Sequence, residues 1–392
     1  MRRASMLTEP SALLIVSNSG RAMAESAARG GYVVTVLDAF CDADTRSVAR
    51  CVPVPMGDRG LDAQRVRGEA GRLAAIDGSL GFVYGAGLEH APSTLSWMAE
   101  RFRLLGNAPE VLELLRDPRR FFALLDELEI LYPQTTFEPP SPAAGAHWLV
   151  KEAGTSGGMG VRRWRDGDAR PAAEHCFQRF LEGPVMSVLF IADGADCSII
   201  GVNRLRTATM GGASSFHYGG ALNRVTLSTP QRAQLGHHCA ALAKALRLRG
   251  INNLDFVLDA GQVRLLELNP RPSATLGLYD EGCPGGWMRR HVRACLGDLA
   301  GAAPPGAGGR VSGHRIVYAP HALGIPPGIR WPHWCHDRPA EGTRVAPGAP
   351  LCTVSASGRT AAQTERRLLD RERGVLDLMD QALPDGAQVA LS

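Results

Sequence analysis

The fold predicted for this chain is decided by two neighbouring segments, LDFVLD (254–259) and RLLELNPR (264–271). Both alternate apolar with polar residues, and 260–262 joins them as a tight turn, which is the pattern of a β-hairpin. Side chains alternate faces along a strand, so Glu267 and Asn269 are expected on one face, with Asp255 supplied by the partner strand. Carboxylate and amide oxygens suit Mg²⁺, and the forked cation of Arg271 suits phosphate oxygens.

A second motif upstream favours a phosphate site over an ordinary hairpin with a polar outer face. A strand at 148–151 ends on Lys151, and a glycine-rich turn at 152–160 leads into a returning strand at 161–164. Glycines let backbone N–H groups approach phosphates closely, and the lysine directs a charge into the same space. Lys244 is the only other lysine among 43 basic residues, which favours a specific role for Lys151. A flexible solvent loop is the alternative.

Length and composition indicate a globular protein with several subdomains. A chain of 392 residues is too long to fold around a single hydrophobic core, and 45% hydrophobic residues are enough to form several cores. The net charge of +4 comes without a basic run interleaved with aromatics, which argues against nucleic acid as a partner. Nine cysteines without a Cys-x-x-Cys pair predict free thiols in a reducing cytoplasm. No apolar stretch reaches membrane-spanning length, so we expect a soluble cytoplasmic protein that does not bind membranes.

The first part of the chain indicates a doubly wound α/β unit. Strands are expected at 13–17, 32–37, 51–54, 81–84 and 103–105, with helices between them. Small-residue turns at 17–20, 85–89 and 106–107 follow strands, at the sheet edge where such folds bind ligands. The turn at 17–20 lacks the dinucleotide fingerprint, so a nicotinamide-dependent oxidoreductase is the weaker of two enzyme hypotheses.

The rest of the chain divides into further units. Antiparallel strands are expected at 185–191 and 197–202, followed by an amphipathic helix at 231–246. An Ala/Gly/Pro linker at 301–309 precedes two strands and a charged helix, and the cluster His333-Trp334-Cys335-His336 lacks distant partners at zinc spacing. We therefore expect a structural role for that cluster. The expected units are an N-terminal α/β domain (1–117), a lid (118–184), a catalytic subdomain (185–300) and a C-terminal appended unit (311–392).

Taken in order, Lys151 with its glycine-rich hairpin, the segment 178–183 and the hairpin 254–271 resemble the ATP-grasp superfamily over about residues 12–300. The resemblance implies an α/β fold with an N-terminal doubly wound domain, a Gly-tipped α+β lid, an antiparallel catalytic α+β domain and a small C-terminal β-rich appendage. The form of 178–188 is similar to the branch containing archaeal tyramine–glutamate ligase of methanofuran synthesis. The unit from Gly313 resembles tails of bacterial members associated with one-carbon cofactor pathways.

The resemblance also implies a site, residue by residue. ATP is expected with Mg²⁺, or Mn²⁺ as an alternative ion, and the implied metal ligands are Asp255, Glu267 and Asn269. Arg271 and Lys151 are the implied catalytic residues. The implied nucleotide-binding residues are Arg119, Lys151, Ser156, Gly157, Gly158, Gly160, Gln178, Arg179, Phe180, Leu181 and Glu182. The chain departs from the family at two positions: Arg119 or Arg120 stands where a second lysine is usual, and Val185 stands where related ligases often have a ribose-binding glutamate.

The implied activity is ATP-dependent carboxylate–amine ligation through an acyl phosphate, extended by the branch resemblance to a methanofuran- or methanopterin-type cofactor. A non-enzymatic, regulatory ATP-binding module of the same fold is the alternative. The expected partners are small-molecule carboxylates and amines, with a homodimer as an alternative to a monomer. Candidate residues of the acceptor pocket are Asn18, Arg21, Glu89, Asn107, Arg204 and His217.

Overall fold

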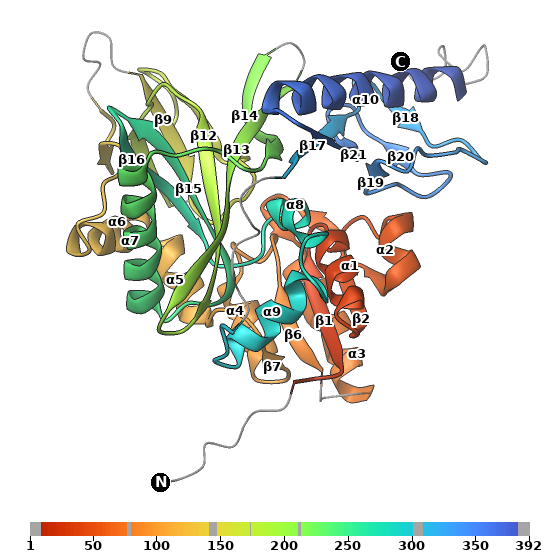
Figure 1. Cartoon of the computed structure of the whole chain (residues 1–392), viewed down its shortest axis with the longest axis horizontal. Helices are drawn as coiled ribbons and strands as arrows, with labels where there is room; N and C mark the ends of the chain where they lie inside the picture. Colours follow the sequence, from red (N-terminus) through yellow and green to blue (C-terminus); the bar gives the residue numbers. More distant parts are fainter. Residues whose placement is uncertain are drawn as a thin grey trace.

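The structure is a computed structural model that describes residues 9–76, 80–140, 147–172, 174–210, 213–300 and 309–382. An N-terminal α/β unit lies beside a long antiparallel sheet, and the C-terminal unit lies above helices α1 (Arg21–Arg29) and α2 (Ala43–Val48) (Figure 1). The expected linker at 301–309 falls outside the described residues, apart from Gly309.

The N-terminal sheet is parallel and has the order β3-β2-β1-β6-β7. Its strands are β1 (Ala12–Ser17), β2 (Val33–Asp38), β3 (Arg50–Pro53), β6 (Gly81–Tyr84) and β7 (Arg103–Leu104). Helices α1, α2, α3 (Ala63–Ile76), α4 (Pro92–Ala99) and α5 (Pro109–Arg116) accompany them. The central strands are nearly continuous apolar runs because both faces are covered. The strand order reverses between β1 and β6, so the ends of these strands form the switch point at which such sheets bind ligands.

The predicted doubly wound unit is confirmed, and its strands lie within a few residues of the expected positions. The short helix α2 and the small hairpin of β4 (Met56–Gly57) and β5 (Gly60–Leu61) were not expected. Both are too short to produce a periodic apolar pattern, so the sequence gives no signal for them.

The lid sheet has the order β10-β9-β11-β8 and its strands pair antiparallel. They are β8 (Thr135–Thr136), β9 (Trp148–Glu152), β10 (Val161–Trp164) and β11 (His175–Arg179). Helix α6 (Pro118–Glu127) precedes the lid, and the carboxylate of Asp117 caps it by accepting hydrogen bonds from the backbone of Arg119 and Arg120. The predicted glycine-tipped hairpin therefore forms, with Lys151 paired opposite Val161 next to the glycine-rich turn.

The main sheet has the order β16-β15-β12-β13-β14-β17-β21-β19. Its first strands are β12 (Val185–Asp193), β13 (Cys197–Met210), β14 (Ala213–Leu222), β15 (Arg249–Asp259) and β16 (Gln262–Asn269). Helix α7 (Thr229–Leu246) packs with α5 and α6 on one face, around Phe190 and Phe256. Helix α9 (Gly286–Cys295) packs on the other face, and its core is continuous with that of the N-terminal sheet. A shared apolar core of this kind fixes the two sheets relative to each other.

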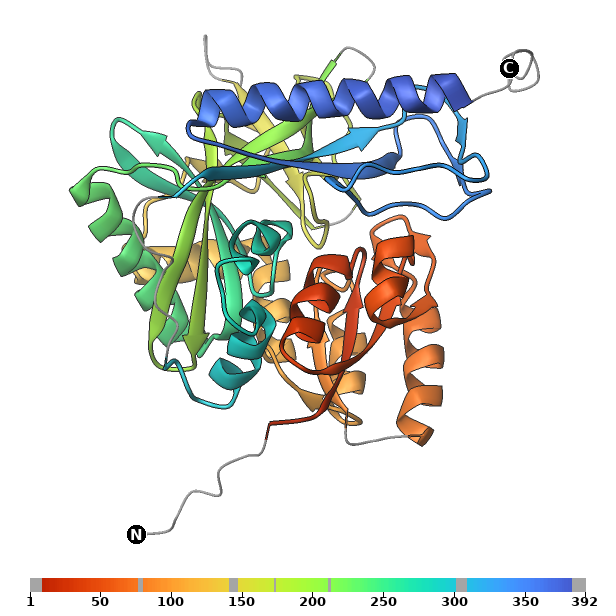
Figure 2. The same ribbon diagram turned by 45° about the vertical axis from the view of Figure 1, so that its right-hand side comes forward.

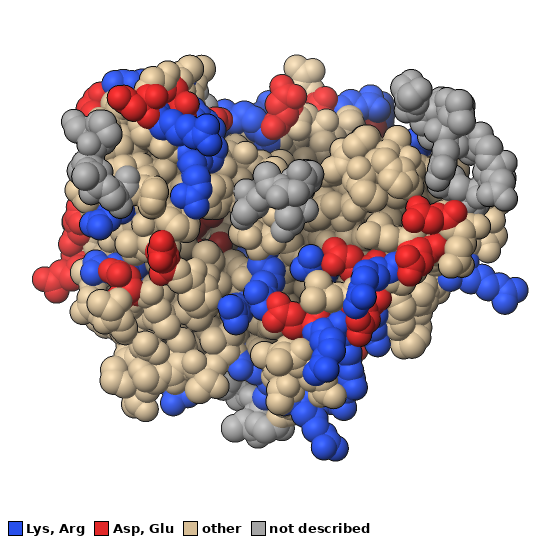
Figure 3. Space-filling view, turned by 90° about the horizontal axis from the view of Figure 1, so that it is seen from above, with Lys and Arg blue, Asp and Glu red and all other residues tan. Residues whose placement is uncertain are grey.

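The C-terminal strands extend the main sheet instead of forming a separate layer. Strand β17 (Val311–Tyr318) pairs with β14, and β21 (Pro350–Gly358) pairs with β17. Helix α10 (Ala361–Ala382) lies along these strands (Figure 2). The remaining elements are the short helices η1 (Ala274–Leu276) and α8 (Gly277–Asp280) and the short strands β18 (Leu323–Gly324), β19 (Cys335–His336) and β20 (Arg344–Val345). Seen from the α10 side, basic and acidic side chains are interspersed (Figure 3).

The expectation that all cysteines are free thiols is wrong for one pair. Cys41 and Cys51 form a disulfide with their Cα atoms 5.7 Å apart, while the other cysteines are free. The parallel pairing of β2 with β3 places Cys51 beside the residues at the end of β2, and a search for Cys-x-x-Cys spacing misses such a pair. None of the described helices is long and apolar enough to cross a membrane.

Candidate functional site

Two carboxylates lie directly opposite each other on the central hairpin. The register of β15 and β16 pairs Asp255 with Glu267 and, two residues along, Asn253 with Asn269. Both carboxylates are half-buried. Burial and the neighbouring Glu267 raise the pKa of Asp255 to about 7, and burial raises the pKa of Glu267 as well. The pair therefore favours either a proton or a bound cation, which is the property of an oxygen-rich metal site.

The lysine of the lid reaches this hairpin. Lys151 Nζ donates hydrogen bonds to the carbonyl oxygen of Leu266 at 3.2 Å and to Gln178 Oε1 at 3.4 Å. Its positive charge lowers the pKa of Glu267, against the effect of burial. The structure thus brings together the two motifs that lie 116 residues apart in sequence, Lys151 and Glu267.

Arg271 is held at the end of the same hairpin by an acid from the N-terminal unit. Its Nε donates to Glu89 Oε1 at 2.6 Å, and its Nη2 donates to Asn269 Oδ1 at 3.0 Å. The second oxygen of Glu89 accepts the backbone N–H of Gly87 at 2.6 Å. Glu89 was expected in an acceptor pocket. Its observed position couples the loop after β6 to Arg271, and this pairing could not be read from the sequence because 182 residues separate the two.

The glycine-rich turn between β9 and β10 packs against β14. The backbone N–H of Tyr218 donates to the Gly157 carbonyl at 2.9 Å. A Cβ on Gly158 would come within 2.0 Å of the Phe216 carbonyl oxygen, so only glycine permits this approach. Ser156 is buried, and Arg59 of the N-terminal unit donates to the Ala153 carbonyl. The turn therefore lies over the sheet in a closed position.

The residues expected around the nucleotide base divide into buried and exposed members. Gln178 is buried and its Nε2 donates to Thr135 Oγ1 at 3.1 Å. Phe180 lies 6.5 Å from Phe216, centroid to centroid, with the Arg163 guanidinium 4.8 Å from its ring. The other three lie at the end of β11 and in the connection to β12: Arg179 and Glu182 are exposed and Leu181 is half-buried.

The arginines expected to replace the second lysine are both exposed. The Arg119 guanidinium lies 4.3 Å from the Phe137 ring. Among the described residues, neither Arg119 nor Arg120 donates a side-chain hydrogen bond. The structure does not bring either guanidinium into contact with Lys151 or Glu267.

Sequence reasoning missed the hydrogen bonds of a buried amide group behind the site. Asn107, expected in an acceptor pocket, is 1% exposed; its Nδ2 donates to Asn252 Oδ1 and to the Pro270 carbonyl, both at 2.7 Å. The Tyr84 hydroxyl donates to the same carbonyl at 3.1 Å. These bonds fix the backbone between Asn269 and Arg271. The sequence feature that could have indicated these hydrogen bonds is the polar pair Asn252-Asn253 inside an otherwise apolar strand.

The donor set fits Mg²⁺. Asp255 and Glu267 offer opposed carboxylate oxygens, and Asn253 Nδ2 orients Asp255 by donating to its Oδ1 at 2.7 Å. Hard oxygen ligands of this type are those that Mg²⁺ takes when it shares its coordination with phosphates. Lys151 and Arg271 flank the carboxylates and could contact phosphate oxygens there.

Comparison with known proteins shows which families the chain is similar to. Residues 116–275 match the family model of the ATP-grasp domain. Among curated proteins, the chain is 26% identical over 191 residues to the arginine-specific carbamoyl phosphate synthase large chain of Bacillus subtilis, covering 44% of this chain and 18% of that protein. The match to the Acidobacterium capsulatum large chain is 28% over 193 residues, with the same coverage. The chain therefore spans about a fifth of the length of the curated relatives it matches.

Solved structures extend the likeness to nearly the whole chain. The L-amino acid ligase of Bacillus licheniformis has a TM-score of 0.70 at 15% identity, covering 93% of this chain and 98% of its own. The biotin carboxylase domain dimer of Hydrogenobacter thermophilus 2-oxoglutarate carboxylase, in complex with MgADP and bicarbonate, has a TM-score of 0.71 at 14% identity, covering 95% and 90%. The protein therefore has the ATP-grasp fold, and its segment 116–275 is similar to the ATP-grasp domain.

Proposed function

We propose that this protein is an ATP-dependent ligase that joins a carboxylate to an amine, with release of ADP and phosphate. The observation that carries the proposal is the direct pairing of Asp255 with Glu267 beside Lys151 and Arg271. Proteins similar to this chain include an L-amino acid ligase, whose name describes bond formation of this type, and carbamoyl phosphate synthases.

The chemistry follows from the charges in the site. A carboxylate oxygen attacks the γ-phosphorus of ATP, the bond to the β-phosphate oxygen breaks, and ADP leaves. The amine nitrogen then attacks the acyl carbon, inorganic phosphate departs with the C–O electron pair, and the nitrogen loses a proton to form the amide. Positioning and charge neutralisation carry both steps, so no nucleophilic side chain is required.

Each protein group has a role in this scheme. Asp255, Glu267 and Asn269 would hold Mg²⁺, which supplies charge neutralisation at the phosphates when it is bound. Lys151 binds the α- and β-phosphates, and the turn containing Ser156–Gly160 covers the β- and γ-phosphates. Arg271, oriented by Glu89, stabilises the transferring phosphoryl group. The segment 178–182 lines the base and ribose.

We further propose that the chain divides into units at 1–117, 118–184, 185–300 and 311–392, and that it belongs to a particular branch of ligases. The form of 178–188 supports placement in the branch of tyramine–glutamate ligase and synthesis of a methanofuran- or methanopterin-type cofactor. The proposed partners are a small carboxylic acid and an amine.

ADP release in a coupled assay, with pools of carboxylic acids and amines, tests the proposal. Release that requires an acid and an amine together is the expected result, and glutamate with an aromatic amine addresses the finer assignment. MgATP binding without ADP release under any pool would instead indicate a regulatory ATP-binding module.

A further inference from the structure

The strand on which the glycine-rich turn lies is shared with the C-terminal unit. In β14, the backbone N–H of Tyr218 donates to the Gly157 carbonyl at 2.9 Å, and the Phe216 carbonyl oxygen lies against Gly158. Residues 220–222 of the same strand pair with β17, the first strand of the C-terminal unit. Tyr218 therefore lies between the lid and the C-terminal unit.

Two side chains of β17 hold Tyr218 at separate points. His314 Nε2 lies 2.7 Å from the Tyr218 hydroxyl, and the Tyr318 hydroxyl donates to the Tyr218 carbonyl oxygen at 2.7 Å. Burial lowers the pKa of His314 to about 4 and raises the pKa of Tyr218, so their hydrogen bond joins two neutral groups at neutral pH. The backbone and the side chain of Tyr218 are thus both fixed by the C-terminal unit.

The backbone next to Tyr218 permits this close approach. Gly220 has a φ of +140°, and a Cβ there would lie 2.2 Å from the His314 carbonyl oxygen. Consecutive residues of β13 pair with Gly220 and then with Tyr218, so Gly219 is left unpaired as a β-bulge. A bulge changes the direction of the side chains beside it. The irregular strand therefore favours the observed contact between Tyr218 and His314.

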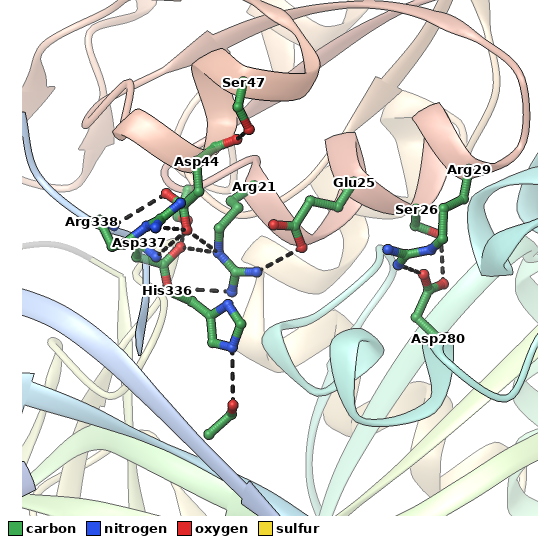
Figure 4. A network of polar contacts seen from close by, with 12 residues as sticks. Arg21, Glu25, Ser26, Arg29, Asp44, Ser47, Asp280, His336, Asp337 and Arg338 are labelled. Carbon is green, nitrogen blue, oxygen red and sulfur yellow. Dashed lines mark hydrogen bonds and ion pairs between the residues drawn. The ribbon is translucent and has the colours of Figure 1, made fainter. Parts of the chain in front are cut away.

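The C-terminal unit is itself fixed to helices α1 and α2 (Figure 4). Arg21 Nε donates to Asp337 Oδ1 at 2.7 Å. Asp44 accepts the backbone N–H groups of Asp337 at 2.8 Å and Arg338 at 3.1 Å. Hydrogen bonds with ionised partners are among the stronger ones in proteins. The strand β17 is therefore not a free edge that moves with the lid, but part of a unit held on the N-terminal unit.

This connection lies close to the contacts of Tyr218. His336, the residue before Asp337, has its Nε2 2.9 Å from Ser355 Oγ. Ser355 pairs directly with His314 in the register of β21 and β17. A continuous series of contacts therefore runs from α1 through the C-terminal unit to the strand beneath the glycine-rich turn.

The turn is held by both units at different places. Arg59 of the N-terminal unit donates to the Ala153 carbonyl at the start of the turn, and Tyr218 donates to Gly157 near its middle. Ser156, between these two points, is buried. The middle of the turn carries the backbone N–H groups proposed to cover the β- and γ-phosphates. Their position therefore depends on Tyr218.

We propose that Tyr218, held by His314 and Tyr318, is a positioning residue that keeps the glycine-rich turn over the phosphates of ATP. The C-terminal unit thereby takes part in nucleotide binding without touching the nucleotide. The inference rests on the proposed function for the identity of the ligand. The turn has to open to admit ATP, and the contacts of Tyr218 fix the position to which it returns. Loss of these contacts should loosen 216–218 and let the nucleotide leave faster.

Hydrogen–deuterium exchange of the full chain tests the proposal, because the Tyr218 amide is itself the donor to Gly157. Exchange is followed in peptides that span 152–160 and 216–222, and MgADP is titrated against the same proteins. Tyr218→Phe removes the hydroxyl and keeps the backbone. We expect faster exchange in both peptides and an affinity for MgADP that is about 2- to 10-fold lower, as for loss of one neutral hydrogen bond.

Tyr132→Phe is the matched control. It also removes one hydroxyl, which donates to Asp126 Oδ1 of α6 at 2.8 Å, and should leave exchange in both peptides and the affinity for MgADP unchanged.

His314 provides a rescue test. His314→Leu should reproduce the effect of Tyr218→Phe, because it removes the partner of the hydroxyl. His314→Gln should restore most of the protection, since an amide can still hydrogen-bond a hydroxyl. Combining Tyr218→Phe with His314→Leu should add little to either change alone, because both remove the same bond.

Unchanged exchange at 152–160 in Tyr218→Phe and His314→Leu would overturn the proposal, whatever their melting temperatures, and would leave a pair that only stabilises the sheet. If Tyr218→Phe does not fold, Tyr318→Phe removes the bond to the Tyr218 carbonyl and gives the same test. Faster exchange of the turn in these variants, in a protein that binds no MgADP, would support the positioning of the turn by Tyr218 and contradict the ligase. Where ligation is observed, Tyr218→Phe should raise the KM for ATP more than it lowers kcat.

Discussion

The two acidic groups of this molecule differ in how their charges are balanced. Asp255 and Glu267 face each other across one hairpin, and Lys151 and Arg271 stand beside them without bonding to either carboxylate. Around α1 and α2, Asp337 and Asp44 are instead bonded to Arg21 or to backbone N–H groups. The pKa of Asp255 is raised by burial, whereas the pKa of Asp337 is lowered to about 2 because Arg21, together with the Thr353 hydroxyl and His336, outweighs the effect of burial.

The difference distinguishes a ligand site from a structural connection. Buried carboxylates without a paired cation destabilise the protein and are available to bind a metal ion. Carboxylates that already have a partner stabilise the protein. Substitutions in the two groups should therefore have effects of different kinds.

The largest effect is expected for Glu267→Gln. Loss of one carboxylate from the proposed metal site should lower Mg²⁺-dependent ADP release by about 100-fold or more, because phosphoryl transfer depends on charge neutralisation. The fold should be retained. Steady-state kinetics with circular dichroism measures both properties, and the exposed Glu113→Gln on α5 is the control. Unchanged kinetics in Glu267→Gln would place the metal elsewhere.

Lys151→Ala should raise the KM for ATP by about 10- to 100-fold, since a charged hydrogen bond to phosphate is lost. The chain provides a matched control in Lys244, its only other lysine, which is exposed on α7. Lys244→Ala should leave the KM within a factor of two. Equal KM values for the two variants would remove Lys151 from the nucleotide site.

Glu89→Gln should lower kcat by about 10-fold, since it weakens the charged hydrogen bond that orients Arg271 toward the transferring phosphoryl group. The KM for ATP should stay nearly unchanged, since Lys151 and the glycine-rich turn, which are proposed to bind the other phosphates, are left intact. A change confined to the melting temperature, with full kcat, would show that Glu89 is only a structural link between the sheets.

The smallest expected effect is on stability: substitutions of Asp255 and Asp337 should change the free energy of unfolding in opposite directions. In metal-free protein at pH 8, Asp255→Asn should raise the free energy of unfolding. Burial moves the pKa of Asp255 from the ordinary 3.8 to about 7, so at pH 8 the folded protein holds an ionised carboxylate that would be more stable in the unfolded chain. Asp337→Asn should lower stability, because a lowered pKa stabilises the fold at every pH above 3.8. Each change should be roughly 1–3 kcal/mol, measured as opposite shifts of thermal unfolding.

Excess Mg²⁺ provides the control for this pair. Mg²⁺ and nucleotide should stabilise the wild type, because a ligand that binds only the native state favours that state. They should stabilise Asp255→Asn much less, because this variant lacks one of the proposed metal ligands. Shifts of the same sign in both variants without metal would contradict the contrast drawn between the two groups.

Local sequence patterns predicted the first acidic group and not the second. Alternation placed Asp255, Glu267 and Asn269 on one face because strand periodicity is set within a few residues. Lys151 could be predicted as a phosphate ligand from its glycine-rich turn, but its contact with the Leu266 carbonyl required the fold. The pairing of Arg21 with Asp337 spans 316 residues and depends on how the C-terminal strands extend the main sheet.

The most direct test is a crystal structure with Mg²⁺ and a non-hydrolysable ATP analogue. We expect Mg²⁺ about 2.1 Å from an oxygen of Glu267, with the β-phosphate in contact with Lys151 beneath the glycine-rich turn. Nucleotide bound on any other surface, with Glu267 and Lys151 making no contact to metal or phosphate, would contradict the assignment of this hairpin and lid as one site.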